Sequence, residues 1–358
     1  MYDPDRIWED LDEISHGKVR LDAIHSAILQ ADQEGDHETG FILRDELIRE
    51  SVFYNDYMDA YIIFPEYYAM CEKYPDLNEE YLWNVLWKFK WIIDNAVCFY
   101  QISMKETEQY LDRFKQMSEK MGYSLRTYYC LMFRVYKYSD LEKANEYYQR
   151  FLAEPRDELS DCKACELSSE IHLQLLNGRE EEAFELFKPM ADGRYSCTEQ
   201  PSFTYARFGE FYFNRGEYKK AEGYYKKFYK AVTRDRLYSD EIGNVVRCYA
   251  FTDPDKALNV FLKFFPRVLE SREPSEIANF AIGACHLWKQ AAWKTGKDTM
   301  LMNLPRQFEL YREDGTYDLN ELYQYFLKQA ERVGYLLDES NMSDEYTNKI
   351  SKLKGMYQ

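Results

Sequence analysis

Three cysteines have the residue type and spacing that metal or redox chemistry requires. Cys162 and Cys165 form a Cys-x-x-Cys pair, and Cys197 follows later in the chain. Three thiolates and one further ligand would make a tetrahedral zinc site. A redox dithiol is a second interpretation, because a helix N-terminus lowers the pKa of a thiol. The third interpretation is that all three are small core residues, as free cysteines usually are.

A zinc site at these cysteines would need a fourth ligand. His172 lies seven residues beyond Cys165, about 10 Å further along a helix, and is therefore excluded. Asp161 and Glu199 are the better candidates, because they lie next to the cysteines in sequence. We expect no cofactor in this protein, with zinc at the three cysteines as the alternative.

Motifs of the common enzyme classes are missing from the sequence. Residues 291–299 are similar to a phosphate-binding loop, but Ala291 stands where glycine is needed and Asp298 where Ser or Thr is needed. Neither His-Glu-x-x-His nor Gly-x-Ser-x-Gly occurs. Paired carboxylates are common in any acidic helical chain, so their spacing selects no catalytic pair. We therefore expect a protein that is not an enzyme.

Charge and composition narrow the class of partner. The net charge is −17, and residues 1–60 contribute −11 of it, from 16 Asp or Glu against 5 Lys or Arg. Such a field repels nucleic acid and anionic membrane surfaces. The sequence has no run of ~18 apolar residues and no basic, apolar start, so we expect neither a membrane span nor a signal peptide. Eight cysteines in 358 residues are too few for a secreted disulfide scaffold. These features predict a cytoplasmic protein, whose acidity suits a basic protein or peptide partner or serves solubility alone.

A helical repeat is the element that must position these side chains. Its clearest copy begins with four residues at spacings of three and four, which share one helix face: Tyr205, Phe208, Gly209 and Tyr212. Gly209 lets a neighbouring helix approach closely. Gly216 ends this helix with a turn-permissive residue. Ala221, on the next helix, stands where the two helices should cross, since a larger side chain would force them apart.

The same frame recurs along the chain. The residues equivalent to Ala221 are Thr107, Ala144, Ala183 and Ala257, and the separations along the series are 37, 39, 38 and 36. Each is followed after four and after seven residues by a large apolar side chain. Within this frame Cys162 and Cys165 begin one repeat, and Cys197 directly precedes the next. Because neighbouring repeats start about 10 Å apart, Cys197 is expected to approach the pair.

This pattern resembles the tetratricopeptide repeat, over about residues 88–265. Residues 156–165 and 196–201 are similar to stretches of bacterial tetratricopeptide proteins of unassigned function. The resemblance implies a bacterial, all-α protein, built as a right-handed α-solenoid of helix-turn-helix repeats with atypical terminal helices. The implied organisation is an acidic helical segment over 1–87 with one degenerate repeat, repeats over 88–271, and capping helices over 272–358. Departures include longer repeats and Gln174 where the family has Tyr.

The resemblance also implies a concave groove, formed by the first helix of each repeat. Its expected lining includes Arg126, Tyr129, Phe133, Tyr136, His172, Phe203, Glu210, Phe213 and Tyr249. This wall is rich in aromatic rings, which predicts pockets for apolar side chains of a partner. The alternative for any one of these residues is that it packs inside the superhelix, against the terminal helices.

The favoured function is a non-enzymatic scaffold that binds a protein or peptide in this groove. Two alternatives remain: an immunity or antitoxin protein that blocks an enzyme, and a peptide-sensing regulator without its own DNA-binding module. Whether the chain forms homo-oligomers is also open. The basic stripe of residues 215–236 is either a solvated helix face or a dock for an acidic segment, such as the N-terminal region of a second copy.

Overall fold

The protein is almost entirely helical, as its sequence predicts. The computed structural model describes residues 2–54, 57–235 and 241–357, in which 17 helices hold 75% of the residues. The N-terminal helices are α1 (Pro4–Asp12), α2 (Lys18–Glu34), α3 (His37–Tyr54), α4 (Tyr57–Lys73) and α5 (Pro75–Ala96). Among these described residues, no helix has both the length and the apolar content needed to cross a bilayer.

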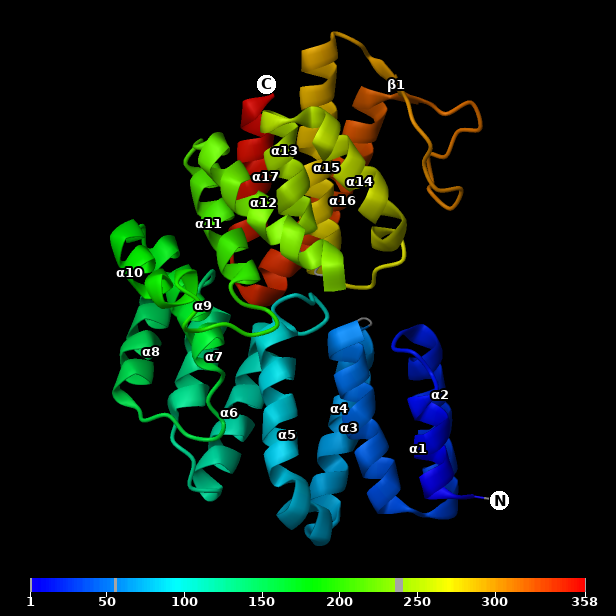
Figure 1. The fold of residues 1–358 in the computed structure, drawn as a ribbon, viewed down its shortest axis with the longest axis vertical. Coiled ribbons are helices and arrows are strands. Elements are labelled where there is room, and N and C mark those ends of the chain that lie inside the picture. The colour runs from blue at the N-terminus through cyan, green and yellow to red at the C-terminus, as the bar shows by residue number, and fades with distance from the viewer. Residues whose placement is uncertain (1, 55–56, 236–240, 358) are drawn as a thin grey trace.

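The middle of the chain forms nine further helices. They are α6 (Met104–Lys120), α7 (Arg126–Tyr136), α8 (Leu141–Ala153), α9 (Lys163–Leu176), α10 (Glu180–Ala191), α11 (Ser202–Asn214), α12 (Tyr218–Asp235), α13 (Ile242–Thr252) and α14 (Pro254–Val268). The C-terminal helices are α15 (Pro274–Thr295), α16 (Leu319–Asn341) and α17 (Glu345–Met356). Figure 1 shows the chain leaving the row of α1–α5, passing through α6–α10 and ending in a second layer that holds α11–α17.

The segment between α15 and α16 differs from the expected loop. It contains two short strands, β1 (Thr299–Leu301) and β2 (Thr316–Asp318), which pair antiparallel with Met300 opposite Tyr317. This ribbon extends from the helical body in Figure 1. Its strands have three residues each, too few to show a period-2 pattern against the Gly, Pro and charged residues around them.

The helix ends and crossings follow the sequence pattern. Gly35 and Gly216 adopt the left-handed conformation, with φ of +72° and +77°, and each separates two helices as expected. The five crossing residues, Thr107, Ala144, Ala183, Ala221 and Ala257, lie on α6, α8, α10, α12 and α14, and all are buried. A Cβ atom on Gly209 would lie 2.8 Å from the ring of Tyr225, so the predicted close helix approach at this glycine is confirmed.

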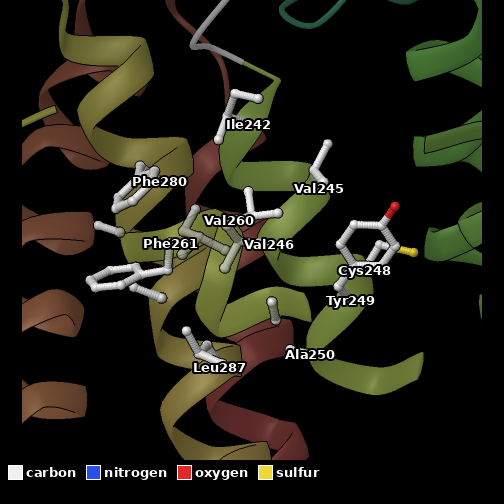
Figure 2. Close-up of a cluster of buried hydrophobic side chains, with 14 of the residues drawn as sticks. Ile242, Val245, Val246, Cys248, Tyr249, Ala250, Val260, Phe261, Phe280 and Leu287 are labelled. Carbon is white, nitrogen blue, oxygen red and sulfur yellow. The ribbon is translucent and has the colours of Figure 1, made fainter. Parts of the chain in front are cut away.

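Two hydrophobic clusters form the core. The N-terminal cluster runs from Leu11 to Leu159 and adds Leu173, and the C-terminal cluster runs from Leu167 to Leu353. Figure 2 shows the part of the C-terminal cluster to which α13, α14 and α15 contribute. The change from one cluster to the other falls near the start of α9, inside the span 88–271 that the sequence pattern treats as one run of repeats.

The C-terminal helices return to the N-terminal half and contact it. Arg272 Nη2 lies 2.6 Å from Asp59 Oδ2 in an ion pair. The backbone N–H of Ser275 donates to the carbonyl of Cys98 at 3.2 Å, and Asn341 Nδ2 donates to the carbonyl of Val97 at 2.7 Å. We call these three contacts the seam. They join residues far apart in sequence, so the helical rows enclose space between them.

Candidate functional site

A cavity of about 1130 Å³ lies between the two halves and is called here the central cavity. Its wall combines residues of α5, α7, α9, α11, α14 and α17 with the loops that precede α9, α11 and α13. Aromatic rings such as Trp87, Trp91 and Tyr138 alternate in this wall with charged side chains of both signs. The wall is therefore more charged than the aromatic groove that the sequence predicts.

Four of the predicted groove residues line the central cavity: Phe133, His172, Phe203 and Glu210. Phe133 offers it almost no side-chain surface, because its ring is buried edge-on against Tyr148 and Phe151. His172 and Glu210 present polar groups to the cavity wall, and both are held by neighbouring side chains. The site is thus built mainly from polar residues, with Phe203 as a half-buried aromatic member.

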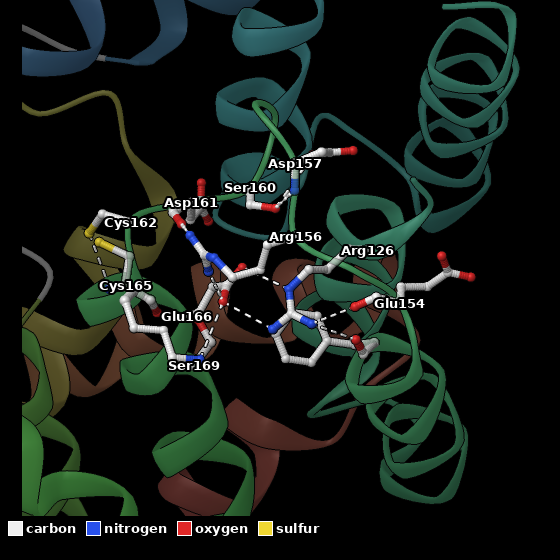
Figure 3. Close-up of polar contacts among 12 residues, drawn as sticks. Arg126, Glu154, Arg156, Asp157, Ser160, Asp161, Cys162, Cys165, Glu166 and Ser169 are labelled. Carbon is white, nitrogen blue, oxygen red and sulfur yellow. Dashed lines mark hydrogen bonds and ion pairs between the residues drawn. The ribbon is translucent and has the colours of Figure 1, made fainter. Parts of the chain in front are cut away.

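Arg126 is absent from the cavity wall and fulfils a structural role. Its guanidinium forms two hydrogen bonds of 3.1 Å with the carboxylate of Glu166. It also donates to the carbonyls of Phe151 and Glu154, at 3.0 and 2.9 Å. Figure 3 shows this buried cluster between α7 and the segment that leads into α9. The interior of the protein satisfies this arginine, so it does not reach a groove.

The other four predicted groove residues also point elsewhere. Tyr129 and Tyr136 stack on Tyr147 of α8, with ring centroids 6.1 and 6.3 Å apart, because α8 covers this face of α7. Phe213 is buried against Phe251 and His286, so α15 occupies the face that a partner was expected to use. Tyr249 is buried within the C-terminal cluster (Figure 2). For Phe213, the structure shows the alternative of packing against a terminal helix.

One ion-pair network lies where α5 meets α7 and α9. Lys90 Nζ approaches Asp161 Oδ1 at 2.7 Å, and Arg134 bridges Asp161 and Asp94 at 3.0 and 3.2 Å. Burial would raise the pKa of Asp161, but Lys90 and Arg134 lower it to about 2. Asp161 therefore remains a carboxylate that is committed to two cations, and it is not a free ligand for a metal at the cysteines.

A second network joins α11 and α17. Lys349 Nζ lies 2.6 Å from Glu345 Oε1 and 3.5 Å from Glu210 Oε1, while Arg207 pairs with Glu241 at 2.5 Å. Burial opposes ionisation of Glu210, but Lys349 and two neighbouring arginines lower its pKa to about 2. Both networks consist of fixed ions whose charges are largely satisfied within the protein.

Lys137 differs from the cations of these two networks. Its ammonium lies 5.2 Å from the ring centroid of Tyr138, and it forms no ion pair or hydrogen bond in the part of the chain that the structure describes. Burial lowers the pKa of Lys137, and the positive charge of Arg207 lowers it further, while Asp94 and Glu345 raise it. The nearby His172 Nε2 lies 3.1 Å from the Tyr138 hydroxyl, and burial next to Arg207 lowers its pKa well below 6.5.

The three cysteines come together as the repeat frame predicts. Cys162 caps α9, and Cys165 lies in its first turn. Their sulfurs and that of Cys197 all lie within 4.8 Å of one another, and all three residues line the central cavity. The Cys165 and Cys197 sulfurs are 3.6 Å apart, so no disulfide joins them.

The three thiols differ in electrostatics. The sulfur–sulfur contact with Cys165, in which either atom can donate, and the backbone N–H groups of Glu199 and Gln200 lower the pKa of Cys197, although burial opposes this shift. The same contact, together with burial, raises the pKa of Cys165. Burial also raises the pKa of Cys162. The cluster therefore places one thiol of lowered pKa beside two thiols of raised pKa.

The basic stripe on α12 takes no part in the cavity. Lys219, Lys220, Lys226 and Lys227 are exposed to solvent, and the first two pair with acidic residues of the same segment. Arg236 lies outside the described residues, as does the side chain of Arg234. The described part of this stripe is a solvated helix face.

Sequence reasoning missed the residues that α5 and α17 bring to the cavity, such as Lys90 and Lys349. It also missed Lys137, which follows α7 by one residue and lies outside the positions that the family uses for its groove. A lysine at the end of a predicted first helix was the available signal for Lys137. No sequence signal placed Lys349 beside Glu210, because the two lie on helices distant in the chain.

No protein-family model matches this chain, and no curated protein matches its sequence. The candidate site is therefore defined by the geometry of the chain itself.

Proposed function

We propose that this protein is a non-enzymatic binding scaffold that holds a polypeptide segment with an acidic side chain in its central cavity. The observation that carries the proposal is Lys137, a cation in the wall of this cavity that forms no direct ion pair or hydrogen bond among the described residues. Burial and Arg207 lower its pKa, while the more distant carboxylates of Asp94 and Glu345 raise it. A carboxylate from a partner would supply a direct ion pair.

The size and lining of the cavity support a peptide occupant. Pockets of about 300–1,000 Å³ enclose ligands of drug size, and about 1130 Å³ is slightly larger. Rings such as Trp91 and Phe203 offer contact area for apolar side chains, and the fixed ions of the wall offer hydrogen bonds. Aromatic rings of this kind dominate the energy of many peptide interfaces.

The carboxylates of the wall support binding over catalysis. General acids and bases work best with a pKa near the working pH. Asp161 and Glu210 instead have pKa values of about 2, because cations on two sides hold each of them ionised. Their arrangement suits a rigid wall.

The proposal also includes the repeat architecture of the chain and its location in the cell. We infer a right-handed, tetratricopeptide-like solenoid in the bacterial cytoplasm. The buried small residues at the crossing positions of α8, α10, α12 and α14 support such a repeat. Its inner face is the wall from which Lys137 and His172 reach the cavity.

A peptide-display experiment tests the function. Random peptides are selected on the wild-type protein, and the best binders are measured against Lys137→Glu. We expect selected peptides to share an acidic residue, and Lys137→Glu to weaken them by roughly 30-fold or more, as truncating one partner of a buried charge pair does.

Lys226→Glu is the matched control, because it makes the same charge change on the exposed face of α12. It should leave peptide affinity unchanged. Equal losses of affinity in the two variants would show that the effect comes from net charge alone. Unchanged affinity for Lys137→Glu would show that peptides do not bind in the cavity.

A further inference from the structure

The thiol cluster of Cys162, Cys165 and Cys197 is a chemical feature that peptide binding does not use. Its members come from two separate segments, the start of α9 and the turn before α11. Figure 3 shows Cys162 and Cys165 next to Asp161 and near the ion pairs of Glu166 with Arg126 and Arg156. Cys162 is exposed and the other two are half-buried, so an ion can reach the cluster.

The distances between the sulfurs fit a single zinc ion. A zinc–sulfur bond of about 2.3 Å in tetrahedral geometry places two sulfurs about 3.8 Å apart. The Cys165 and Cys197 sulfurs are 3.6 Å apart, and no pair in the cluster exceeds 4.8 Å. A rotamer adjustment of about 1 Å would bring all three to coordination distance.

Polar groups surround the sulfurs. The Cys165 N–H donates to the Cys162 sulfur at 3.4 Å, and the Cys197 N–H donates to the carbonyl of Gln200 at 3.2 Å, which fixes the turn that carries Cys197. N–H groups that donate to sulfur orient metal-binding thiolates and offset their charge. Arg134 reaches Ser169 at 2.8 Å, and the Ser169 hydroxyl donates to the carbonyl of Cys165 at 3.1 Å, which adds a cation to this surrounding shell.

The described residues supply three ligands and no fourth. No further His, Cys, Asp or Glu ligand atom within the described ranges lies within 4.8 Å of all three sulfurs. Of the two candidates that the sequence suggests, Asp161 is held by Lys90 and Arg134, and Glu199 has no carboxylate oxygen within 4.8 Å of all three sulfurs. Three protein ligands with a fourth position for water or an incoming donor are typical of reactive zinc sites, whereas structural sites are closed.

We propose that Cys162, Cys165 and Cys197 bind one zinc ion whose fourth coordination position opens to the central cavity. In the free protein water takes this position. The site ties the start of α9 to the turn before α11, and it does not depend on the peptide proposed above.

The test uses the full chain, purified without chelators and then supplied with Zn²⁺. Elemental analysis should find one zinc per chain in the wild type. It should also find one in Cys98→Ser, a matched control that changes a cavity-lining cysteine outside the cluster. Cys165→Ser and Cys197→Ser should lose the metal. Cys162→Ser provides a second variant at an exposed position, where folding is not at risk.

Cobalt replacement tests the open position. Co²⁺ in the site should show sulfur-to-metal charge transfer and intense visible bands of a tetrahedral thiolate centre, and added imidazole should change those bands. A Co²⁺ spectrum that does not change when imidazole is added would show that the fourth coordination position is not open. Absence of bound metal with all three thiols titratable would overturn the site, as would a Cys165–Cys197 disulfide in the isolated protein with no metal uptake after reduction.

Discussion

At the scale of single residues, the buried ion pair of Arg126 and Glu166 is expected to make a large contribution to the free energy of unfolding. Arg126→Ala would remove the two-point partner of Glu166, whose side chain is only 2% exposed, and the donor to two carbonyls. Arg156 and Lys163 would still pair with Glu166, so its charge would not be left uncompensated. Hydrogen bonds to a charged group contribute about 1.5–3 kcal/mol. We expect a loss of this size in the free energy of unfolding measured with urea.

Lys188→Ala is the control, since Lys188 and Glu185 form an exposed pair on α10. Exposed pairs contribute about 1 kcal/mol or less. A loss below about 1 kcal/mol for Arg126→Ala would show that its contacts are not maintained in solution.

A buried histidine predicts a pH dependence. Burial, and the charge of Arg247, lower the pKa of His286 from 6.5 to about 3. The unfolded chain therefore binds the proton first as the pH falls. The stabilising contribution of neutral His286 is complete above about pH 6.5 and is lost progressively towards pH 3, at about 1.4 kcal/mol per pH unit.

His286→Gln keeps a polar side chain that can still contact the Tyr357 hydroxyl, which lies 3.0 Å from His286 Nδ1. Its unfolding free energy should fall less steeply than that of the wild type between pH 6.5 and 5. Above pH 7.5 the difference between the two proteins should be constant. Identical slopes at acidic pH would contradict a neutral buried imidazole.

Individual residues were predictable where their spacing alone fixes their neighbours. The sequence spacing predicted that Cys197 approaches Cys165, because it placed both at the starts of adjacent predicted repeats. The roles of Arg126 and Phe213 were not predictable in this way. A helical period says which residues share a face, but it does not say whether a partner or another helix of the same chain covers it.

At the scale of helices, the backbones of α13 and α15 approach each other closely where the two helices cross. A Cβ atom on Gly243 would lie 2.3 Å from the carbonyl oxygen of Asn279, and one on Gly283 would lie 2.3 Å from that of Gly243. Because backbone atoms cannot rotate away, Gly243→Ala must separate the helices. We expect a loss of about 1–3 kcal/mol or more in unfolding free energy.

Gly223→Ala is the matched comparison within the exposed face of α12, where an added Cβ meets nothing within 4 Å. Alanine favours a helix interior over glycine by about 1 kcal/mol, so this variant should be more stable than the parent. Both changes can be followed by urea unfolding. A Gly243→Ala protein as stable as Gly223→Ala would mean that the two helices do not touch as described.

Helices and the turns between them were the features of this structure that the sequence predicted best. Turn glycines such as Gly35 and small crossing residues such as Ala183 mark local turns and helix crossings. Such local geometry depends on residues that are close in sequence, so the sequence pattern predicts it. The ribbon of β1 and β2 was missed for the converse reason. Its central pair, Met300 and Tyr317, joins residues 17 positions apart through a loop without a regular pattern.

At the scale of the whole molecule, the seam decides whether the central cavity stays enclosed. We predict that combining Arg272→Ala with Asn341→Ala removes two of its three contacts. Exposed ion pairs and single hydrogen bonds contribute about 1 kcal/mol each, so overall stability should fall only slightly. Hydrogen exchange should nevertheless accelerate in residues 97–100 and leave the core of α13 unchanged.

Arg332→Ala, on the exposed face of α16, is the control and should leave exchange at residues 97–100 unaltered. Unaltered exchange in the double variant as well would mean that the two halves are not held together by these contacts. The seam itself was beyond prediction from the sequence. Its partners lie in different helical rows, and no repeat period relates Asp59 to Arg272 or Val97 to Asn341.

The contacts of the seam can form only late in the synthesis of the chain. Val97 and Asn341 are separated by 244 positions. At roughly 5–20 residues per second, a ribosome needs about 12–50 s to extend the chain from one to the other. During that interval α5 and α7 can already fold on the N-terminal cluster, while α17, which contributes Tyr346 and Lys349 to the cavity wall, does not yet exist. The wall of the central cavity is therefore completed only as synthesis ends.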